Sequence, residues 1–177
     1  MKICICGDSF AADPNGWASR LDEEVTNKSQ RGIGEYKIYQ QSTNHEQYDR
    51  IIVCHTSPWR IHTPLHPIYQ NSEQRPNNDF MLADLDHHKS TSKEIHAIYS
   101  YITKYTDWDY QKFVYNMIVD KLLSIPNSIH ITFHEPSNTE KIPHNYHDVW
   151  QKYPGDINHL NMLGNEVVAK RIQKLLQ

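Results

Sequence analysis

Two short, uninterrupted apolar runs are the feature that most constrains how this chain can fold. Ile3-Cys4-Ile5-Cys6 lies near the start of the chain, and Ile51-Ile52-Val53-Cys54 lies further along it. A strand with one wet face alternates apolar and polar residues, whereas a strand covered on both faces is apolar throughout. The two runs therefore predict strands at residues 2–6 and 51–54, in a sheet that has helices on both sides.

The rest of the chain alternates between helical and strand patterns. Apolar residues three or four apart indicate helices, and strict alternation indicates a strand. Strands that alternate with helices predict an α/β protein, here a three-layer α/β/α sandwich with a central, mainly parallel sheet. The expected helices are one that carries Trp17, Leu21 and Val25, one that carries Tyr36, Ile38 and Tyr39, and those over 92–105, 110–124 and 160–176; the further strands are expected at 24–27 and 129–133.

Chain length and proline content indicate how the domain is organised. A chain of 177 residues is expected to form a single domain, 1–177. Four of its nine prolines fall within residues 56–91, where few apolar residues are periodic, so we expect a long loop or insertion there. Long loops in compact domains are usually functional, which makes this segment a candidate lid or substrate-binding excursion. Residues 135–155 are expected to form a second, polar loop.

Composition and charge argue against polyelectrolyte and membrane partners. The formal net charge is −3, both signs are mixed, and no basic stretch is interleaved with aromatic residues, so we expect no nucleic-acid partner. Mean hydropathy is −0.74 and the longest apolar runs are only a few residues, far short of a membrane span. The first residues lack a signal-peptide pattern. We therefore expect a cytoplasmic protein with no membrane partner.

The cysteines and histidines do not predict a metal or a cofactor. The three cysteines, Cys4, Cys6 and Cys54, form no Cys-x-x-Cys pair, which argues against a disulfide framework and a structural zinc site. We expect them to be small core residues. The twelve histidines include no His-Glu-x-x-His or similar ligand spacing.

Two polar motifs lie where an active site is expected. Gly7-Asp8-Ser9 directly follows the first apolar run, and Asp156-x-x-His159 directly precedes the last helix. Sites in open parallel sheets form beyond the carboxyl ends of the strands, where Ser9, Thr56 and His134 are expected to share one rim. Serine, histidine and an orienting carboxylate are the three parts of a nucleophilic hydrolase. The alternative for Asp8-Ser9 is a plain helix-capping turn.

These motifs resemble the conserved blocks of the SGNH (GDSL) hydrolases. Gly7-Asp8-Ser9-Phe10 is similar to the first block of that family, and residues 27–32, which end in Gly32, are similar to the second. Residues 156–161 together with Gly164 are similar to the fifth block. The matches fall in the family's order and span nearly the whole chain. The resemblance implies a flavodoxin-like SGNH hydrolase fold and acyl-transfer chemistry.

The resemblance also implies a role for each site residue. Ser9 would be the nucleophile, His159 the base and Asp156 the carboxylate that orients the histidine. Gly32, Thr56 and Asp8 would form the oxyanion and substrate-binding group. The third block departs from the family, because its asparagine, an oxyanion donor, is absent after the strand at 51–54. There the chain continues as His55-Thr56-Ser57, which offers the hydroxyl of Thr56 or Ser57 as a replacement.

The predicted function is that of a serine esterase that hydrolyses short acyl esters through an acyl-enzyme on Ser9. O-acetyl groups on carbohydrate are candidate substrates, because the polar 56–91 segment carries Trp59, Tyr69 and Phe80, which are suited to stacking on sugars. The alternative is a catalytically weak or inactive module of the same fold that binds a glycan or a protein partner. The absent third-block asparagine favours this alternative, and the retained Ser9, Asp156 and His159 disfavour it.

Overall fold

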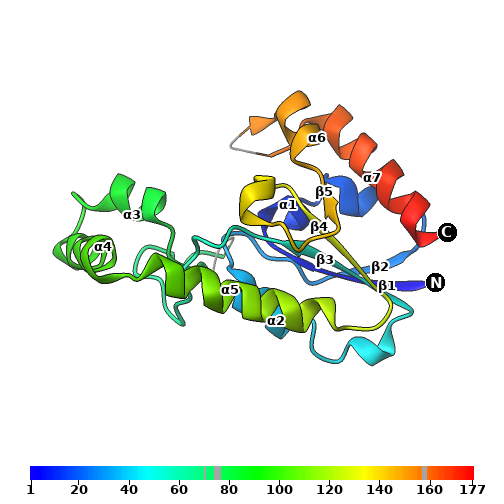
Figure 1. Ribbon diagram of the computed structural model, residues 1–177. Helices are drawn as coiled ribbons and strands as arrows, with labels where there is room; N and C mark the ends of the chain where they lie inside the picture. The colour runs from blue at the N-terminus through cyan, green and yellow to red at the C-terminus, as the bar shows by residue number, and fades with distance from the viewer. Residues whose placement is uncertain (70, 74–76, 157–158) are drawn as a thin grey trace.

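The protein is built on a five-stranded, all-parallel sheet. The computed structural model describes residues 1–69, 71–73, 77–156 and 159–177. The strand order is β2-β1-β3-β4-β5, the doubly wound order of flavodoxin-like sheets. This arrangement confirms the predicted α/β class with a central parallel sheet (Figure 1). The strands are β1 (Lys2–Gly7), β2 (Glu24–Asn27), β3 (Arg50–His55), β4 (Ser128–Thr132) and β5 (His144–Asn145).

Helices cover both faces of the sheet. One face carries α1 (Ser9–Ala12), α6 (His147–Lys152) and α7 (Met162–Leu176), and the other carries α2 (Glu35–Gln41) and α5 (Trp108–Leu123) (Figure 1). Two further helices, α3 (Leu82–His88) and α4 (Lys93–Tyr105), project beyond the end of the sheet opposite the two chain termini. Short 3₁₀ turns lie at Trp17–Arg20, His45–Gln47 and Pro136–Asn138.

The core explains why the first apolar run has no polar member. Ile5 of β1 packs on one face of the sheet in the cluster that contains Ile172 of α7. Cys6, the next residue, packs on the other face in the cluster that contains Leu122 of α5. All three cysteines are buried and free, as expected of small core residues. The apolar run in β3 is divided between the two clusters in the same way.

The first helix differs from its prediction. Trp17, Leu21 and Val25 are spaced as on one helix face, but the chain forms only the 3₁₀ turn Trp17–Arg20 and is extended at Leu21. Val25 lies in β2, where it pairs with Ile3 of β1. Pairing with the edge of a buried parallel strand has outweighed a weak helical preference here.

The two segments predicted as loops contain regular structure. Residues 56–91 include α3 and an antiparallel bridge between Ile61 and Phe80, and residues 135–155 include β5 and α6. Each helix is held by a buried apolar residue, Leu85 in α3 and Val149 in α6. Such short elements depend on tertiary packing, so their sequences show little periodicity. No helix in the described ranges is long and apolar enough to cross a lipid bilayer.

Candidate active site

A large cavity opens at the carboxyl edge of the sheet. Its volume is about 900 Å³, and it is lined by Ser9, Gly32, Asp156 and His159 together with Asp8. We call it the Ser9 cavity. The parallel topology brings these residues together, because β1 ends just before Ser9 and the turn before α7 reaches the same edge. A volume of this size is typical of small-molecule sites.

Ser9 is exposed to this cavity at the first position of α1. Asp8 is the N-cap of the helix, and its Oδ1 accepts the backbone N–H of Phe10 at 3.0 Å. The capping turn anticipated as an alternative is therefore present, and it holds Ser9 at the cavity wall. Within the described part of the chain, Ser9 Oγ makes no hydrogen bond.

Two histidine rings lie close to one aromatic ring, that of Phe10. The Phe10 ring lies 5.7 Å from the His159 ring and 5.9 Å from the His134 ring, and it stacks on Phe133 at 4.6 Å. His134 also lines the Ser9 cavity, and burial lowers its pKa, so it is neutral at physiological pH. Phe10 thus contacts two imidazoles that line the Ser9 cavity, of which the sequence motif singles out His159.

Asp156 is less engaged than its predicted role requires. Its side chain is exposed, and among described residues its carboxylate accepts no hydrogen bond. The backbone carbonyl of Asp156 accepts the N–H of His159 at 3.1 Å, which closes a tight turn. Ile157 and Asn158, which belong to the same predicted block, lie outside the described residues. The structure therefore brings Asp156 to the cavity without joining its carboxylate to the imidazole.

Asp8 and Thr56 form a buried link beneath Ser9. Thr56 Oγ1 donates to Asp8 Oδ2 at 2.8 Å and accepts from Arg60 Nε at 3.2 Å. Both side chains are buried. Thr56 is not among the residues that line the Ser9 cavity. A hydroxyl has one proton, and the proton of Thr56 is committed to Asp8. The carboxylate of Asp8 has none to give, so neither side chain donates toward the cavity in this structure.

Gly32, the predicted oxyanion donor, lies on the lining of the Ser9 cavity. Its φ is +78°, a left-handed conformation that favours glycine. Its carbonyl accepts from the backbone N–H of Asp79 at 2.9 Å and from Arg60 Nη1 at 3.1 Å. No acceptor for its N–H is found in the described ranges, which leaves that donor available to a ligand.

The aromatic residues proposed to stack on sugars lie elsewhere. Trp59 packs edge-on against Trp108 with ring centroids 5.9 Å apart, and Phe80 joins the apolar cluster of α3 and α4. Tyr69 packs against His66. None of Trp59, Tyr69 and Phe80 lines the Ser9 cavity. The 56–91 segment instead contributes Arg60 and Asn78 to the cavity, two residues that the motif analysis did not place in the site.

A buried chain of hydrogen bonds crosses the sheet behind Thr56. Ser128 Oγ lies 2.6 Å from both the Ile125 carbonyl oxygen and His130 Nε2. A carbonyl only accepts, so the hydroxyl donates to Ile125 and His130 Nε2 donates to Ser128. His130 Nδ1 is then an acceptor, and it receives the proton on His55 Nε2 at 2.9 Å. One further proton is shared between His55 Nδ1 and Glu35 Oε1, which are 2.5 Å apart.

The buried histidine in this series of hydrogen bonds predicts that the protein is less stable in acid. The pKa of His130 is lowered to about 3, first by burial and then by the charges of His55 and His144. The pKa of a histidine in the unfolded chain is about 6.5, so as the pH falls the unfolded chain takes up this proton before the folded protein does. We expect the free energy of unfolding to be fully retained above about pH 6.5 and to fall by up to about 1.4 kcal/mol per pH unit toward pH 3.

Urea unfolding between about pH 7.5 and about pH 5 measures this dependence. A His130→Gln variant removes the titrating group and should show a shallower loss across the same range. His66 and His134, whose pKa values are also lowered by burial, account for the slope that persists. Equal slopes for the variant and the wild type would show that His130 does not carry the effect.

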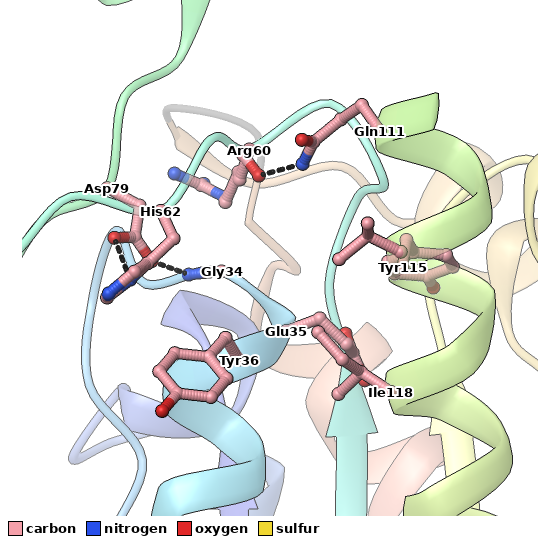
Figure 2. A pocket seen from close by; sticks show the side chains of 10 residues that line it. Gly34, Glu35, Tyr36, Arg60, His62, Asp79, Gln111, Tyr115 and Ile118 are labelled. Atoms are coloured by element: carbon pink, nitrogen blue, oxygen red, sulfur yellow. Dashed lines mark hydrogen bonds and ion pairs between the residues drawn. The ribbon is translucent and has the colours of Figure 1, made fainter. Parts of the chain in front are cut away.

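A second, smaller cavity lies between α2 and α5. Its volume is about 250 Å³, and its lining includes Glu35 and Tyr36 of α2 and Tyr115 and Ile118 of α5, all labelled in Figure 2. Arg60 lines both cavities. No serine, threonine or cysteine is among the described residues that line this second cavity. The second cavity therefore offers no serine that could take the role predicted for Ser9.

Comparisons of the sequence with protein-family models and with curated proteins give no significant match. In the parts of the chain that the structure describes, no group of three or more His, Cys, Asp or Glu side chains is placed to hold a metal ion.

Proposed function

We propose that this protein is a serine esterase that hydrolyses short acyl esters through an acyl-enzyme on Ser9. The observation that carries the proposal is the meeting of Ser9 and His159, from opposite ends of the chain, in one cavity at the carboxyl edge of the sheet. The Gly32 N–H, which has no partner in the described chain, belongs to the lining of the same cavity and supports the proposal as a candidate oxyanion donor. The first N–H groups of a helix have no intrahelical acceptor, so the N–H of Ser9 is a second such donor.

The proposed reaction needs only the ester and water. Ser9 Oγ bonds to the carbonyl carbon, its proton passes to His159, and the carbonyl π pair moves onto oxygen. The tetrahedral intermediate collapses, the bond to the alcohol oxygen breaks, and that oxygen takes the proton from His159. Water then bonds to the acyl carbon and gives a proton to His159; the bond from that carbon to Ser9 Oγ breaks, Ser9 Oγ takes the proton from His159, and the carboxylic acid leaves. Asp156 would turn toward His159 when substrate is bound, since catalytic hydrogen bonds often tighten only in the complex.

Short acyl groups suit the site better than lipid chains. Polar and charged residues outnumber apolar ones in the cavity lining, whose apolar members include Phe10, Met81 and Leu160. We propose O-acetyl esters of carbohydrates as the first substrates to screen, recognised through polar side chains. Three free, buried cysteines are in keeping with a reducing compartment, and we place the enzyme in the cytoplasm.

Labelling with a fluorophosphonate tests the proposal directly. This probe bonds to an activated serine oxygen, so wild type should be labelled and a Ser9→Ala variant should not. Ser29→Ala is a matched control, because Ser29 lies outside the Ser9 cavity, and it should be labelled as fast as wild type. Equal labelling of Ser9→Ala would remove Ser9 from its role.

The second candidate function is a binding module that does not catalyse. It is favoured by the exposed Asp156 carboxylate and by the lack of a hydrogen bond between Ser9 Oγ and any described residue. A folded wild type that takes no fluorophosphonate label would select this candidate, with a glycan or a protein as the ligand of the Ser9 cavity.

A further inference from the structure

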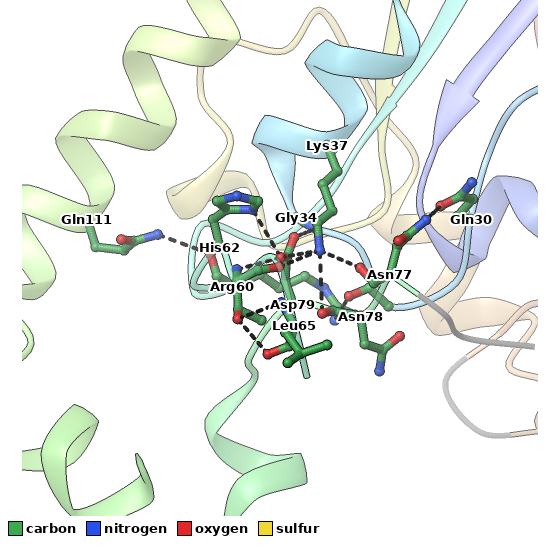
Figure 3. Close-up of polar contacts among 12 residues, drawn as sticks. Gln30, Gly34, Lys37, Arg60, His62, Leu65, Asn77, Asn78, Asp79 and Gln111 are labelled. Atoms are coloured by element: carbon green, nitrogen blue, oxygen red, sulfur yellow. Dashed lines mark hydrogen bonds and ion pairs between the residues drawn. The ribbon is translucent and has the colours of Figure 1, made fainter. Parts of the chain in front are cut away.

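The side chain of Asn78 is buried beside the Ser9 cavity with its polar atoms unused. Asn78 is 1% exposed, and neither Nδ2 nor Oδ1 has a hydrogen-bond partner among the residues described. Figure 3 shows its carboxamide without a contact in an otherwise densely bonded cluster. A buried amide without partners is unfavourable for folding, and native proteins rarely keep one. An amide placed this way is a candidate ligand-binding group.

The location of Asn78 ties it to the proposed oxyanion site. Asn78 lines the same cavity as Ser9 and Gly32. Its carboxamide packs directly on Gly32, since a Cβ built on that glycine would lie 1.8 Å from Asn78 Oδ1. The unpartnered N–H of Gly32 and the unpartnered amide of Asn78 are therefore neighbours.

The backbone on both sides of this amide is fixed by a buried anchor. The N–H of Asp79 donates to the Gly32 carbonyl at 2.9 Å, and Asp79 Oδ2 accepts the N–H of Gly34 at 2.6 Å. Lys37 Nζ pairs with Asp79 Oδ1 at 2.7 Å and donates to the Asn77 carbonyl at 2.6 Å (Figure 3). Asn78 is thus held against Gly32 by contacts that do not use its own side chain, which is the preorganisation that transition-state stabilisation requires.

We propose that Asn78 is a catalytic residue, whose Nδ2 donates a hydrogen bond to the ester oxygen as negative charge develops on it. It acts together with the backbone N–H groups of Ser9 and Gly32, and this role rests on the proposed function. The other side chains near that position are engaged, because Thr56 donates to Asp8 and Arg60 donates to Thr56 and Gly32. The 56–91 segment therefore contributes a hydrogen-bond donor to the site, at a position that no sequence motif indicates.

Kinetics with p-nitrophenyl acetate as the probe test this role. Asn78→Ala should lower kcat by about 10²- to 10³-fold and change KM little, the usual result of removing one oxyanion donor. Asn78→Asp, which keeps the shape but has no N–H and adds negative charge, should lower kcat at least as much. Asn77→Ala is the matched control, because Asn77 bonds to Gln30 on the surface, and it should retain wild-type kcat.

Thermal unfolding separates a catalytic role from a structural one. Because the Asn78 amide is buried without partners, its removal should leave Tm unchanged or raise it while kcat falls. A lower Tm together with unchanged kcat would overturn the proposal, and so would a loss confined to KM or recovery of kcat in Asn78→Asp.

The outcome for Asn78 is distinguishable from the outcome for the proposed function. Wild type labelled at Ser9, with kcat intact in Asn78→Ala, would overturn the role of Asn78 and leave the esterase in place. Wild type that neither labels nor turns over would overturn the esterase, and the role of Asn78 with it.

Discussion

On the proposed mechanism, replacing His159 with alanine should lower kcat for hydrolysis of p-nitrophenyl acetate by about 10³- to 10⁶-fold, as removal of the base does in known serine hydrolases. The hydroxyl of Ser9 is a weak nucleophile at neutral pH and needs a group that takes its proton. His159 shares the Ser9 cavity and is held beside Phe10. Steady-state kinetics, with folding checked by circular dichroism, measure the loss.

Two further variants sharpen this result. Ser9 and His159 act as a unit, so a variant with both changed to alanine should be no slower than the worse of the two single variants. His134→Ala is the matched comparison, because His134 lines the same cavity and also contacts Phe10. We expect the His134→Ala substitution to lower kcat by less than about tenfold. A larger loss for His134→Ala than for His159→Ala would transfer the role of base to His134.

The sheet was predictable because its signals are local. The apolar runs in β1 and β3 and the alternation in β4 each lie within a few residues, and the structure confirms all three strands. β5 and α6 were missed, because β5 is only His144–Asn145 and α6 is held mainly by the burial of Val149. Elements this short take their stability from the neighbours that they contact, and sequence periodicity does not record those contacts.

In the candidate site, too, residues in local motifs could be predicted and residues placed by tertiary contacts could not. Ser9 and His159 sit in compact motifs at strand and helix ends, where topology alone brings them to one edge. Asn78 could not be found in this way, because its placement depends on the buried pairing of Asp79 with Lys37 and with the N–H of Gly34. Thr56 was expected as a donor to substrate, but the prediction could not include the neighbouring carboxylate of Asp8 that takes its proton.

Replacing Glu35 with alanine should lower the free energy of unfolding by about 3–5 kcal/mol, the usual cost of breaking a buried polar pair by removing one partner. Glu35 is buried, and its two oxygens bond to His55 Nδ1 at 2.5 Å and to the N–H of Thr56 at 3.1 Å. The alanine would leave both groups without a partner inside the sheet. Urea unfolding at neutral pH measures the change.

Glu35→Gln is the matched control. The donor and acceptor assignments in the buried series of hydrogen bonds predict that the protein tolerates this substitution. His55 Nε2 donates to His130, so a neutral His55 presents Nδ1 as an acceptor. The glutamine Nε2 can donate to that atom while its oxygen accepts from Thr56, so both hydrogen bonds survive. We expect a loss within about 1 kcal/mol. A glutamine variant as unstable as the alanine variant would show that an ionised His55–Glu35 pair, rather than the hydrogen-bond pattern, stabilises this part of the sheet.

The same pair of variants tests whether the buried chain supports catalysis. Glu35 holds the backbone of Thr56, Thr56 holds Asp8, and Asp8 caps the turn that presents Ser9. Glu35→Ala should therefore lower kcat for p-nitrophenyl acetate even where the variant is still folded, and Glu35→Gln should retain it. Because Glu35 lies behind Thr56 and does not line the Ser9 cavity, a loss of kcat in the alanine variant alone would mark it as a positioning residue that acts through Thr56 and Asp8.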